Sequence, residues 1–381
     1  MKMPANLKRT LTSLACALAI TGCSEKTPST HTGEVQSDTT RPATPFAQID
    51  DEKASLVFIQ GTEALKATRA SAKTLTEAIN HFLSAPTDEH LKNAQKHWTS
   101  ATIEYRRFSF FRHLGLVEPS SFATLNRLDY QIYGYPIQPG FIDTFGQYKY
   151  SGLVHDIGFP ITEESLVNQH GLTDLADIVL GFYAIEFLLF NSGKERKASD
   201  FTQIVSISKT LKERGFETLE EIPNNRRRKL LNEQAKILSS DLKSIEKYWS
   251  DPTGGFQKKW QTFNHQKRID TILSALVSSL TQVMIEIGEL NQEAGTNTHV
   301  SPGIYSANID DKKKFIHYAV ASIKSGNALL VSDTTQETEA LLDQALSLTS
   351  GNIQQEDSSE KELWRTVFAS IKSASDHLND I

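Results

Sequence analysis

Apolar residues recur at alternating spacings of three and four over long windows of this 381-residue chain. That spacing places one apolar stripe along an amphipathic α-helix. Runs that alternate apolar and polar residues, which would predict strands, are nearly absent. The sequence therefore predicts an all-α fold. The three clearest stripes are Leu65, Thr68, Ala72, Leu75, Ile79 and Phe82; Leu231, Ala235, Leu238, Leu242, Ile245 and Trp249; and Ile269, Leu273, Leu276, Leu280, Val283, Ile287 and Leu290.

Short breaks rich in proline and glycine interrupt these stripes. Long helices joined by short breaks predict two antiparallel helical bundles packed together. We expect an N-terminal bundle over residues 51–215 and a C-terminal bundle over residues 216–381. Residues 116–165 differ, because they are rich in proline, glycine and aromatic residues and show no clean stripe. A long irregular segment in a compact helical protein is often functional.

Residues 1–22 have the layout of an export signal, with a basic start followed by the short apolar segment Leu11 to Ile20. That segment is too short to span a bilayer as a helix. It ends at Ile20-Thr21-Gly22-Cys23, which resembles a bacterial lipoprotein box. The alternative is an ordinary signal peptide with an incidental cysteine. The resemblance implies acylation of Cys23 and attachment to the membrane through lipid, and Ser24 after it favours the outer membrane, facing the periplasm or the surface.

Residues 23–50 are rich in Ser, Thr and Pro and hold few large apolar groups, so they predict a disordered tether behind the lipid. The chain has two cysteines, Cys16 in the leader and Cys23 at the lipid, so the mature protein is expected to have no disulfide. The net charge of −6 gives no indication of nucleic-acid binding.

The most apolar run of the chain is "GFYAIEFLLF", residues 181–190. We expect a helix that begins near Thr173, with Asp174 and Asp177 in its first turn, and ends near Asn191. It is too short for a membrane span, so it should lie buried inside a bundle.

Glu186 and Tyr183 stand three positions apart in this run and therefore share a helix face. A buried carboxylate must be paired, protonated or bound to a cation, because an isolated charge is costly to bury. In a structural interpretation an arginine pairs with Glu186. In a functional interpretation Tyr183 and Glu186 join His155 or Asp156 in a site for a hard cation, such as ferric iron, calcium or magnesium rather than zinc. The candidate arginines are Arg106, Arg107, Arg112 and Arg127.

Several segments together resemble the imelysin-like proteins, also called the M75 peptidase family. "DIVLGFYAIEFLLFNSG" is similar to the family's Gly-x-His-x-x-Glu motif inside an apolar helix. Further similar segments are "HWTSATIEYRRFSFFR", "GFID", "SGLVHDIGFPIT", "NRRRKLLNEQAKILSSDLKSIEKYW" and, more weakly, "SPGIYSANIDD". The resemblance covers most of residues 51–381.

The resemblance implies two helical bundles with the motif near their interface, export to the bacterial envelope, and a link to iron uptake or regulation. Gly181, Glu186 and Phe187 to Leu189 match the motif, but Tyr183 replaces its His and Phe190 stands where Trp is common. A metallopeptidase would depend on that His, and the chain has no His-Glu-x-x-His arrangement.

These observations favour a non-enzymatic envelope lipoprotein that binds a metal ion or an iron-bearing ligand between two bundles. The alternatives are an M75-type metallopeptidase and a scaffold whose site has decayed. The basic run Arg226 to Lys229 predicts a solvated face or an interdomain set of ion pairs, with a partner-docking patch as the minority interpretation. The tryptophans Trp98, Trp249 and Trp364 are predicted core residues.

Overall fold

The computed structural model describes residues 51–191, 196–290, 309–330, 333–350 and 357–379. Over these residues the fold is all-α, as predicted, and the one strand-like pairing is an isolated bridge between Phe145 and Tyr148. The signal peptide, Cys23 and the tether lie outside the described residues. The described residues form fourteen α-helices and two 3-10 helices, which are α1 Asp51–Ser84, α2 Asp88–Arg106, α3 Ser109–Val117, α4 Ala123–Tyr133, α5 Pro139–Ile142, α6 Glu163–Gln169, α7 Gly181–Phe190, η1 Ala198–Phe201, α8 Lys209–Glu213, η2 Leu219–Glu221, α9 Pro223–Ser250, α10 Phe256–Thr262, α11 His265–Leu290, α12 Ile309–Asn327, α13 Asp333–Ser350 and α14 Asp357–Asn379.

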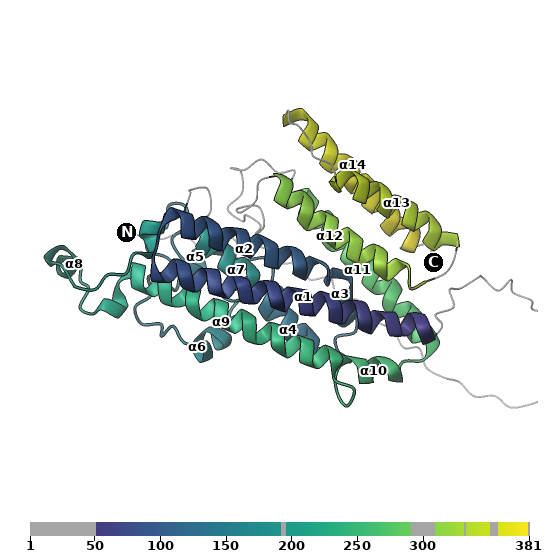
Figure 1. Ribbon diagram of the computed structural model, residues 1–381, viewed down its shortest axis with the longest axis horizontal. Helices are drawn as coiled ribbons and strands as arrows, with labels where there is room; N and C mark the ends of the chain where they lie inside the picture. Colours follow the sequence, from purple (N-terminus) through teal and green to yellow (C-terminus); the bar gives the residue numbers. More distant parts are fainter. Residues whose placement is uncertain (1–50, 192–195, 291–308, 331–332, 351–356, 380–381) are drawn as a thin grey trace, which may run out of the picture. The chain divides into compact units, whose positions relative to one another are not determined.

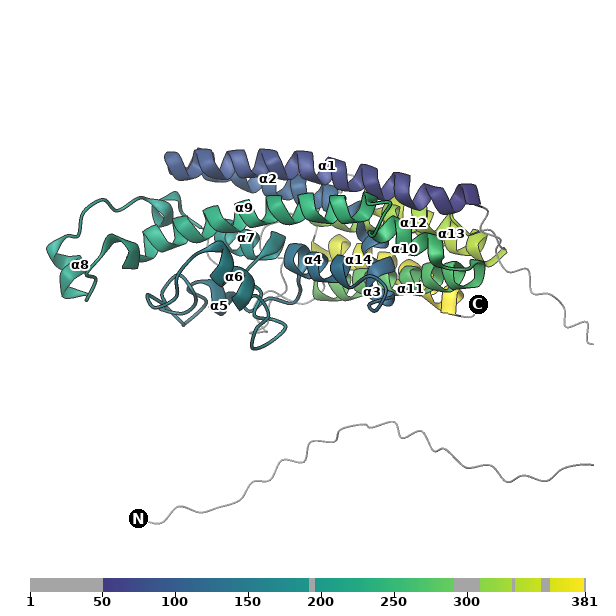
Figure 2. The same cartoon turned by 90° about the horizontal axis from the view of Figure 1, so that it is seen from below.

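The helices form two antiparallel bundles packed together (Figures 1 and 2). In the first, α9 packs against α1, α4 and α7, and α2 packs against α1 and α7. In the second, α11, α12, α13 and α14 pack in a ring, each against the next and α14 against α11. Helix α3 contacts α11, α12 and α4, and so lies between the two groups. The expected division at residues 215 and 216 stays a prediction, and α9, which follows it, packs with the helices that precede it.

The predicted stripes form the core. The members on α1 and α9 are buried, and so are the described members on α11 except the half-buried Leu273. The tryptophans Trp98, Trp249 and Trp364 are buried as predicted. Helix α11 is long and apolar enough to cross a membrane, but a buried core helix passes the same test, and α11 packs against α3, α12 and α14.

Two expectations about local structure are wrong. Residues 116–165 include the eleven-residue helix α4, whose stripe of Leu125, Leu128 and Ile132 is buried. The motif helix begins at Gly181 rather than near Thr173. Asp177 accepts hydrogen bonds from the Thr173 hydroxyl at 2.5 Å and from the Asp174 backbone N–H at 3.1 Å. The acidic residues therefore close a turn instead of capping a helix.

Candidate functional site

Glycine at position 181 fixes where the motif helix α7 starts. Its φ is +84°, and a Cβ there would lie 2.4 Å from the Ile132 carbonyl oxygen and 2.5 Å from that of Gln131. A side chain would be strained by the backbone and would collide with the end of α4. The first residue of the motif is therefore a glycine because α7 begins directly against the backbone of α4.

Side chains from neighbouring helices hold the backbone of α7 and of the segment before it. The Trp98 Nε1–H donates to the Phe182 carbonyl at 2.8 Å, and the Gln95 amide donates to the Leu189 carbonyl at 2.9 Å. His170 Nδ1 accepts from the backbone N–H groups of the two residues before α7, at 3.2 and 3.3 Å. Burial lowers the pKa of His170 to about 4, so the neutral ring can accept. These contacts fix the position of Tyr183.

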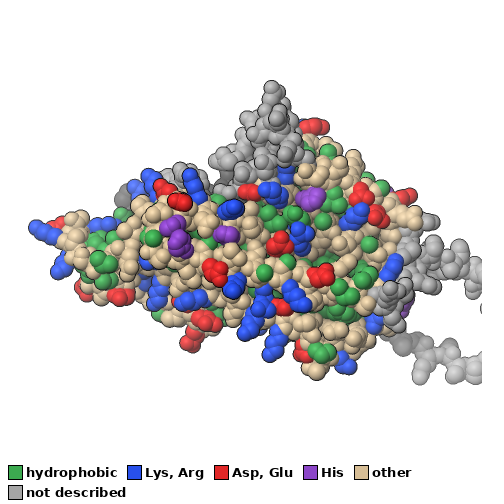
Figure 3. Space-filling model, in the orientation of Figure 1, with side chains coloured by type: hydrophobic (Ala, Val, Ile, Leu, Met, Phe, Trp, Pro, Cys, Tyr) green, Lys and Arg blue, Asp and Glu red, His purple; other side chains and the backbone are tan. Residues whose placement is uncertain are grey.

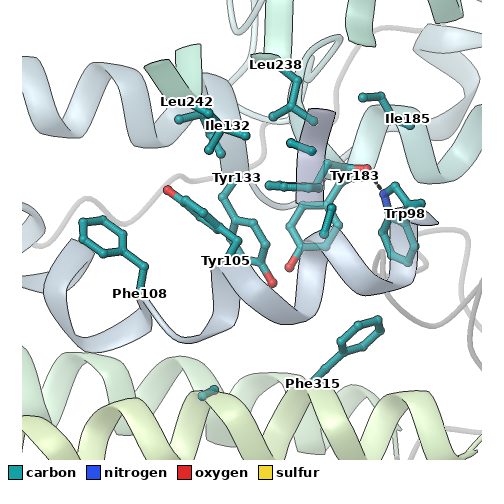
Figure 4. Close-up of a cluster of buried hydrophobic side chains, with 14 of the residues drawn as sticks. Trp98, Tyr105, Phe108, Ile132, Tyr133, Tyr183, Ile185, Leu238, Leu242 and Phe315 are labelled. Atoms are coloured by element: carbon teal, nitrogen blue, oxygen red, sulfur yellow. Dashed lines mark hydrogen bonds between the residues drawn. The ribbon is translucent and has the colours of Figure 1, made fainter. Parts of the chain in front are cut away.

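Tyr183, which replaces the motif His, lies among other tyrosines. Its ring centroid is 4.6 Å from that of Tyr133 and 6.0 Å from that of Tyr135 (Figure 4 shows Tyr133 and Tyr183 side by side). The two hydroxyls of Tyr133 and Tyr183 share a hydrogen bond. Burial raises the pKa of Tyr183 well above its usual value and that of Tyr133 to about 12. Both are therefore neutral phenols at physiological pH.

Two buried arginine–carboxylate pairs lie beside these tyrosines. Arg112 donates to both oxygens of Asp129, at 2.7 and 2.8 Å, and the Tyr105 hydroxyl donates to the same carboxylate at 2.7 Å. Arg106 donates to both oxygens of Glu286 on α11. The guanidinium carbons of Arg106 and Arg112 lie 5.5 and 5.0 Å from the Tyr133 ring centroid, within the range of a cation–π contact.

A cavity of about 180 Å³ opens next to the Arg112–Asp129 pair. We call it the tyrosine pocket. It lies where α3, α4 and α11 meet, and so between the two bundles. Neither Tyr183 nor Glu186 lines it, but Tyr183 contacts two of its lining residues, Tyr133 and Tyr135. Its lining residues are Arg112, Leu116, Asn126, Asp129, Tyr130, Tyr133, Gly134, Tyr135 and Gln282.

Glu186 is completely buried on α7. The arginines predicted as its partners also bind other groups. Arg106 pairs with Glu286 and Arg112 with Asp129, as described above. Arg107 lies 2.9 Å from Glu104, and Arg127 donates to Gln131 at 2.8 Å. The arginine partner and the ligand role of Glu186 both stay predictions.

His155 belongs to a second buried cluster, centred on Asp143, which we call the Asp143 cluster. Arg227 donates to both Asp143 oxygens at 2.6 and 3.0 Å, Arg196 donates at 3.2 Å, and His155 Nε2 lies 3.5 Å away. The Thr144 backbone N–H donates to the same carboxylate at 2.8 Å. Burial alone would raise the pKa of Asp143, but its hydrogen bonds from His155 and Arg227 and the nearby guanidinium charges hold it well below its usual range.

Asp156 makes a third set of contacts, separate from those of Tyr183 and His155. Its side chain accepts from the Gly158 N–H at 3.0 Å, and its carbonyl accepts from Arg226. The contacts of Tyr183, His155 and Asp156 described here are thus with different neighbours. The basic run is not a solvated face at Arg226 and Arg227, which are buried and hold the segment of residues 143–159.

In the part of the chain that the structure describes, no group of three or more His, Cys, Asp or Glu residues is placed to hold a metal ion. In the tyrosine pocket a guanidinium repels cations, and Arg112 already neutralises Asp129. A bare cation therefore does not fit this pocket. The predicted cation site at Tyr183 and Glu186 stays a prediction.

The residues of the tyrosine pocket other than Arg112 were not singled out from the sequence. The signal available was the run "LDYQIYGYP", residues 128–136, where two tyrosines flank a glycine just after a carboxylate. Periodicity assigned this run to an irregular segment. The pairing of Asp129 with Arg112, seventeen residues earlier, is a tertiary contact.

Comparisons with known proteins agree with the predicted family. The family model described as imelysin matches residues 61–301. No functionally curated protein matches the chain. Among solved structures, one from Parabacteroides distasonis ATCC 8503, titled an iron-regulated protein A precursor, aligns with a TM-score of 0.55 and 13% identity, over 89% of this chain and 96% of that chain.

An imelysin-like protein from Psychrobacter arcticum 273-4 aligns with a TM-score of 0.50 and 14% identity, over 88% of this chain and 93% of that chain. At these identities the two structures support the fold, and the family model, which spans more than half of the chain, supports the family. The chain, with Tyr183 at the position of the motif His, belongs to the imelysin family.

Proposed function

We propose that this protein is a non-enzymatic binding lipoprotein of the bacterial envelope, and that the tyrosine pocket holds a small oxygen-rich anion that carries iron. The observation that carries the proposal is the composition of the pocket. Its polar lining comprises three phenols, the Arg112 guanidinium and two amides, while the Asp129 carboxylate is neutralised by Arg112. These phenol, amide and guanidinium groups suit a ligand rich in acceptor oxygens. The Tyr130 hydroxyl also donates to the Leu175 carbonyl at 2.7 Å and the Gln282 amide to Glu286 at 3.1 Å, so a ligand would share or replace these acceptors.

The size of the pocket limits the ligand. Ligand pockets commonly measure roughly 300–1,000 Å³, and this cavity measures about 180 Å³. It would take a small chelate or one end of a larger one. The iron component rests on the family resemblance and on the name of the P. distasonis protein, which is called iron-regulated. The envelope location rests on the lipoprotein box that ends at Cys23.

Among the residues described, the tyrosine pocket lacks the groups that a metallopeptidase needs, a histidine that binds metal and a carboxylate that acts as general base. His113, which follows the lining residue Arg112, is bonded to the Ser278 hydroxyl at 2.8 Å, and burial and the neighbouring arginines lower its pKa well below its usual value. The Asp129 carboxylate is held by two guanidinium nitrogens and one phenol, which makes it a poor general base.

Thermal melts test the binding proposal with three probes: ferric citrate, citrate alone and ferric ion with a non-binding buffer. We expect ferric citrate to raise the melting temperature of the wild-type protein, because a ligand of the native state stabilises it by mass action. The Tyr133→Phe and Gln282→Ala variants should lose most of that shift. Tyr150→Phe, at an exposed tyrosine, is the matched control and should keep it.

The outcomes separate the alternatives. A shift by ferric ion alone that is lost in Glu186→Gln would favour a cation site on α7 instead of the pocket. Zinc-dependent peptide cleavage that Glu186→Gln abolishes would establish the metallopeptidase. No shift with any probe would contradict the binding proposal.

The location has its own test. We expect Cys23→Ala to release the protein from membranes or to leave it unprocessed. Membrane fractionation of the two forms measures this, and a variant that stays anchored would rule out acylation at Cys23.

A further inference from the structure

A second and larger cavity lies away from the tyrosine pocket. It has a volume of about 810 Å³ and runs between the C-terminal end of α1, the segment of residues 157–161, the segment of residues 203–205 and the N-terminal part of α9. We call it the basic groove. It shares no lining residue with the tyrosine pocket.

The groove carries positive charge on a chain whose net charge is −6. Its lining includes Arg226, Arg228 and Lys229 and a single carboxylate, Glu220. Arg226 is occupied by backbone carbonyls of the segment it holds. Arg228 donates to the Phe201 carbonyl at 2.8 Å through one of its nitrogens, and Lys229 is exposed. Two cations therefore remain to meet an anionic partner.

Apolar side chains stand at the rim and the floor of the groove. Ile157 and Val205 are 58% and 74% exposed, while Leu83 is buried beneath them. At the end of the molecule that carries α8, Figure 3 shows hydrophobic, basic and acidic side chains close together. Exposed aliphatic residues around a groove are typical of a surface that binds another chain.

The segment of residues 203–205 also offers backbone groups. The Asn225 amide bonds both backbone groups of Ile204, each at 2.9 Å, as a neighbouring strand would. Among the described residues, the backbone N–H and C=O groups of Gln203 and Val205 make no hydrogen bond. Unpaired main-chain groups along a groove are a feature that binds an extended peptide by strand addition.

We propose that the basic groove docks an extended acidic segment of a partner protein. The main chain of that segment pairs with Gln203 and Val205, its apolar side chains pack against Ile157 and Val205, and its carboxylates meet Arg228 and Lys229. A peptide suits the groove better than an enclosed small molecule, because the rim residues stay largely exposed and the free backbone groups match a main chain.

Fluorescence anisotropy with a labelled seven-residue peptide of alternating Asp and Val tests this on the full folded chain. We expect wild-type protein to bind it and the Arg228→Glu/Lys229→Glu variant to bind at least about tenfold more weakly. A peptide of alternating Lys and Val should bind the double variant better than the wild type. Lys243→Glu is the matched control, since Lys243 is exposed on the same helix and does not line the groove.

Arg228 also bonds a carbonyl, so its loss could disturb folding. The Val205→Asp/Lys229→Glu variant changes only exposed groups and should lose binding to the same degree. Circular dichroism checks that each variant is folded. Equal affinity across the variants, or no binding of the acidic peptide by wild type, would overturn the proposal. Groove-dependent binding to phosphatidylglycerol vesicles without peptide binding would overturn it in favour of a lipid surface.

Discussion

The Asp143 cluster and the tyrosine pocket both bury a carboxylate against arginine, but they leave different room around it. Asp143 receives hydrogen bonds from two guanidinium groups and a backbone N–H, with His155 beside it. Asp129 receives one guanidinium and one phenol, and a cavity opens next to it. An arginine–carboxylate pair thus holds neighbouring segments together in the Asp143 cluster and lines a cavity in the tyrosine pocket.

The difference has a physical origin. Buried charges must be compensated wherever they lie, so a buried arginine–carboxylate pair does not by itself indicate function. What separates the two regions is the neighbouring space and the phenol and amide groups that line it. By that criterion His155 lies beside a saturated carboxylate, while the residues around Tyr133 border open space.

The largest expected effect is at the saturated cluster. Asp143→Ala should destabilise the protein by about 3–5 kcal/mol, because removing one partner strands Arg227 and Arg196 in the interior. Urea unfolding at pH 7 measures this. Asp156→Ala is the control and should cost about 1 kcal/mol or less, since that side chain is exposed and caps one N–H.

The Asp143 carboxylate should also make the stability of the folded protein fall at acid pH. The folded-state pKa of Asp143 lies below its unfolded value. Its contribution is therefore present above the unfolded pKa and lost as the pH falls below it. In Asp143→Asn this part of the acid dependence should disappear. An unchanged acid profile in that variant would mean that other carboxylates set it.

The next prediction concerns the close approach of α7 to α4 at Gly181. Gly181→Ala should cost about 2–3 kcal/mol, because the new methyl group meets a positive φ and two carbonyls of α4. Gly146→Ala is a matched control, since Gly146 also has a positive φ but no atom within 4 Å of its Cβ position. Thermal or urea unfolding of the two variants isolates the close approach. Equal costs would show that backbone strain alone explains the glycine.

Asp241 on α9 is a third carboxylate, and unlike Asp143 and Asp129 it receives no hydrogen bond from an arginine among the described residues. Its Oδ2 is buried without a hydrogen-bond partner among the described residues, and burial raises its pKa to about 7 although Arg127 acts against this. The folded state then holds a proton that the unfolded state releases, so stability falls as the pH rises from about 4 to 7. Asp241→Asn should stabilise the protein at pH 8 by about 2 kcal/mol and have little effect at pH 4. Melts at the two pH values test this, and a destabilised variant at pH 8 would contradict it.

The smallest effect is expected at the position of the motif His. Tyr183→Phe removes the hydrogen bond between the Tyr183 and Tyr133 hydroxyls and keeps the ring packing, so it should cost about 1 kcal/mol or less. Unfolding of Tyr183→Phe beside Tyr150→Phe measures it. A cost of several kcal/mol would mean that the Tyr183 hydroxyl has a further partner in the interior.

Much of the fold could be predicted from the sequence because helix periodicity is a local property. The stripes on α1 and α9 identified the core positions, and the motif run identified a buried helix with the correct end. The start of that helix could not be predicted in the same way. Asp174 and Asp177 favour a helix start by local rules, but they close a turn, and α7 begins only where Gly181 meets α4.

By itself the sequence determined the all-α class, the bundles, the family and the buried carboxylate at Glu186, since these depend on spacing and motif. Tertiary structure decided which polar groups meet. It joined Asp143 to Arg227, Asp129 to Arg112 and Tyr183 to Tyr133, and it placed His155 beside Asp143. The physical reason is that a buried polar group must be satisfied by whatever lies across the packed interface. That partner is set by how the helices pack and not by the residues next to it in the chain.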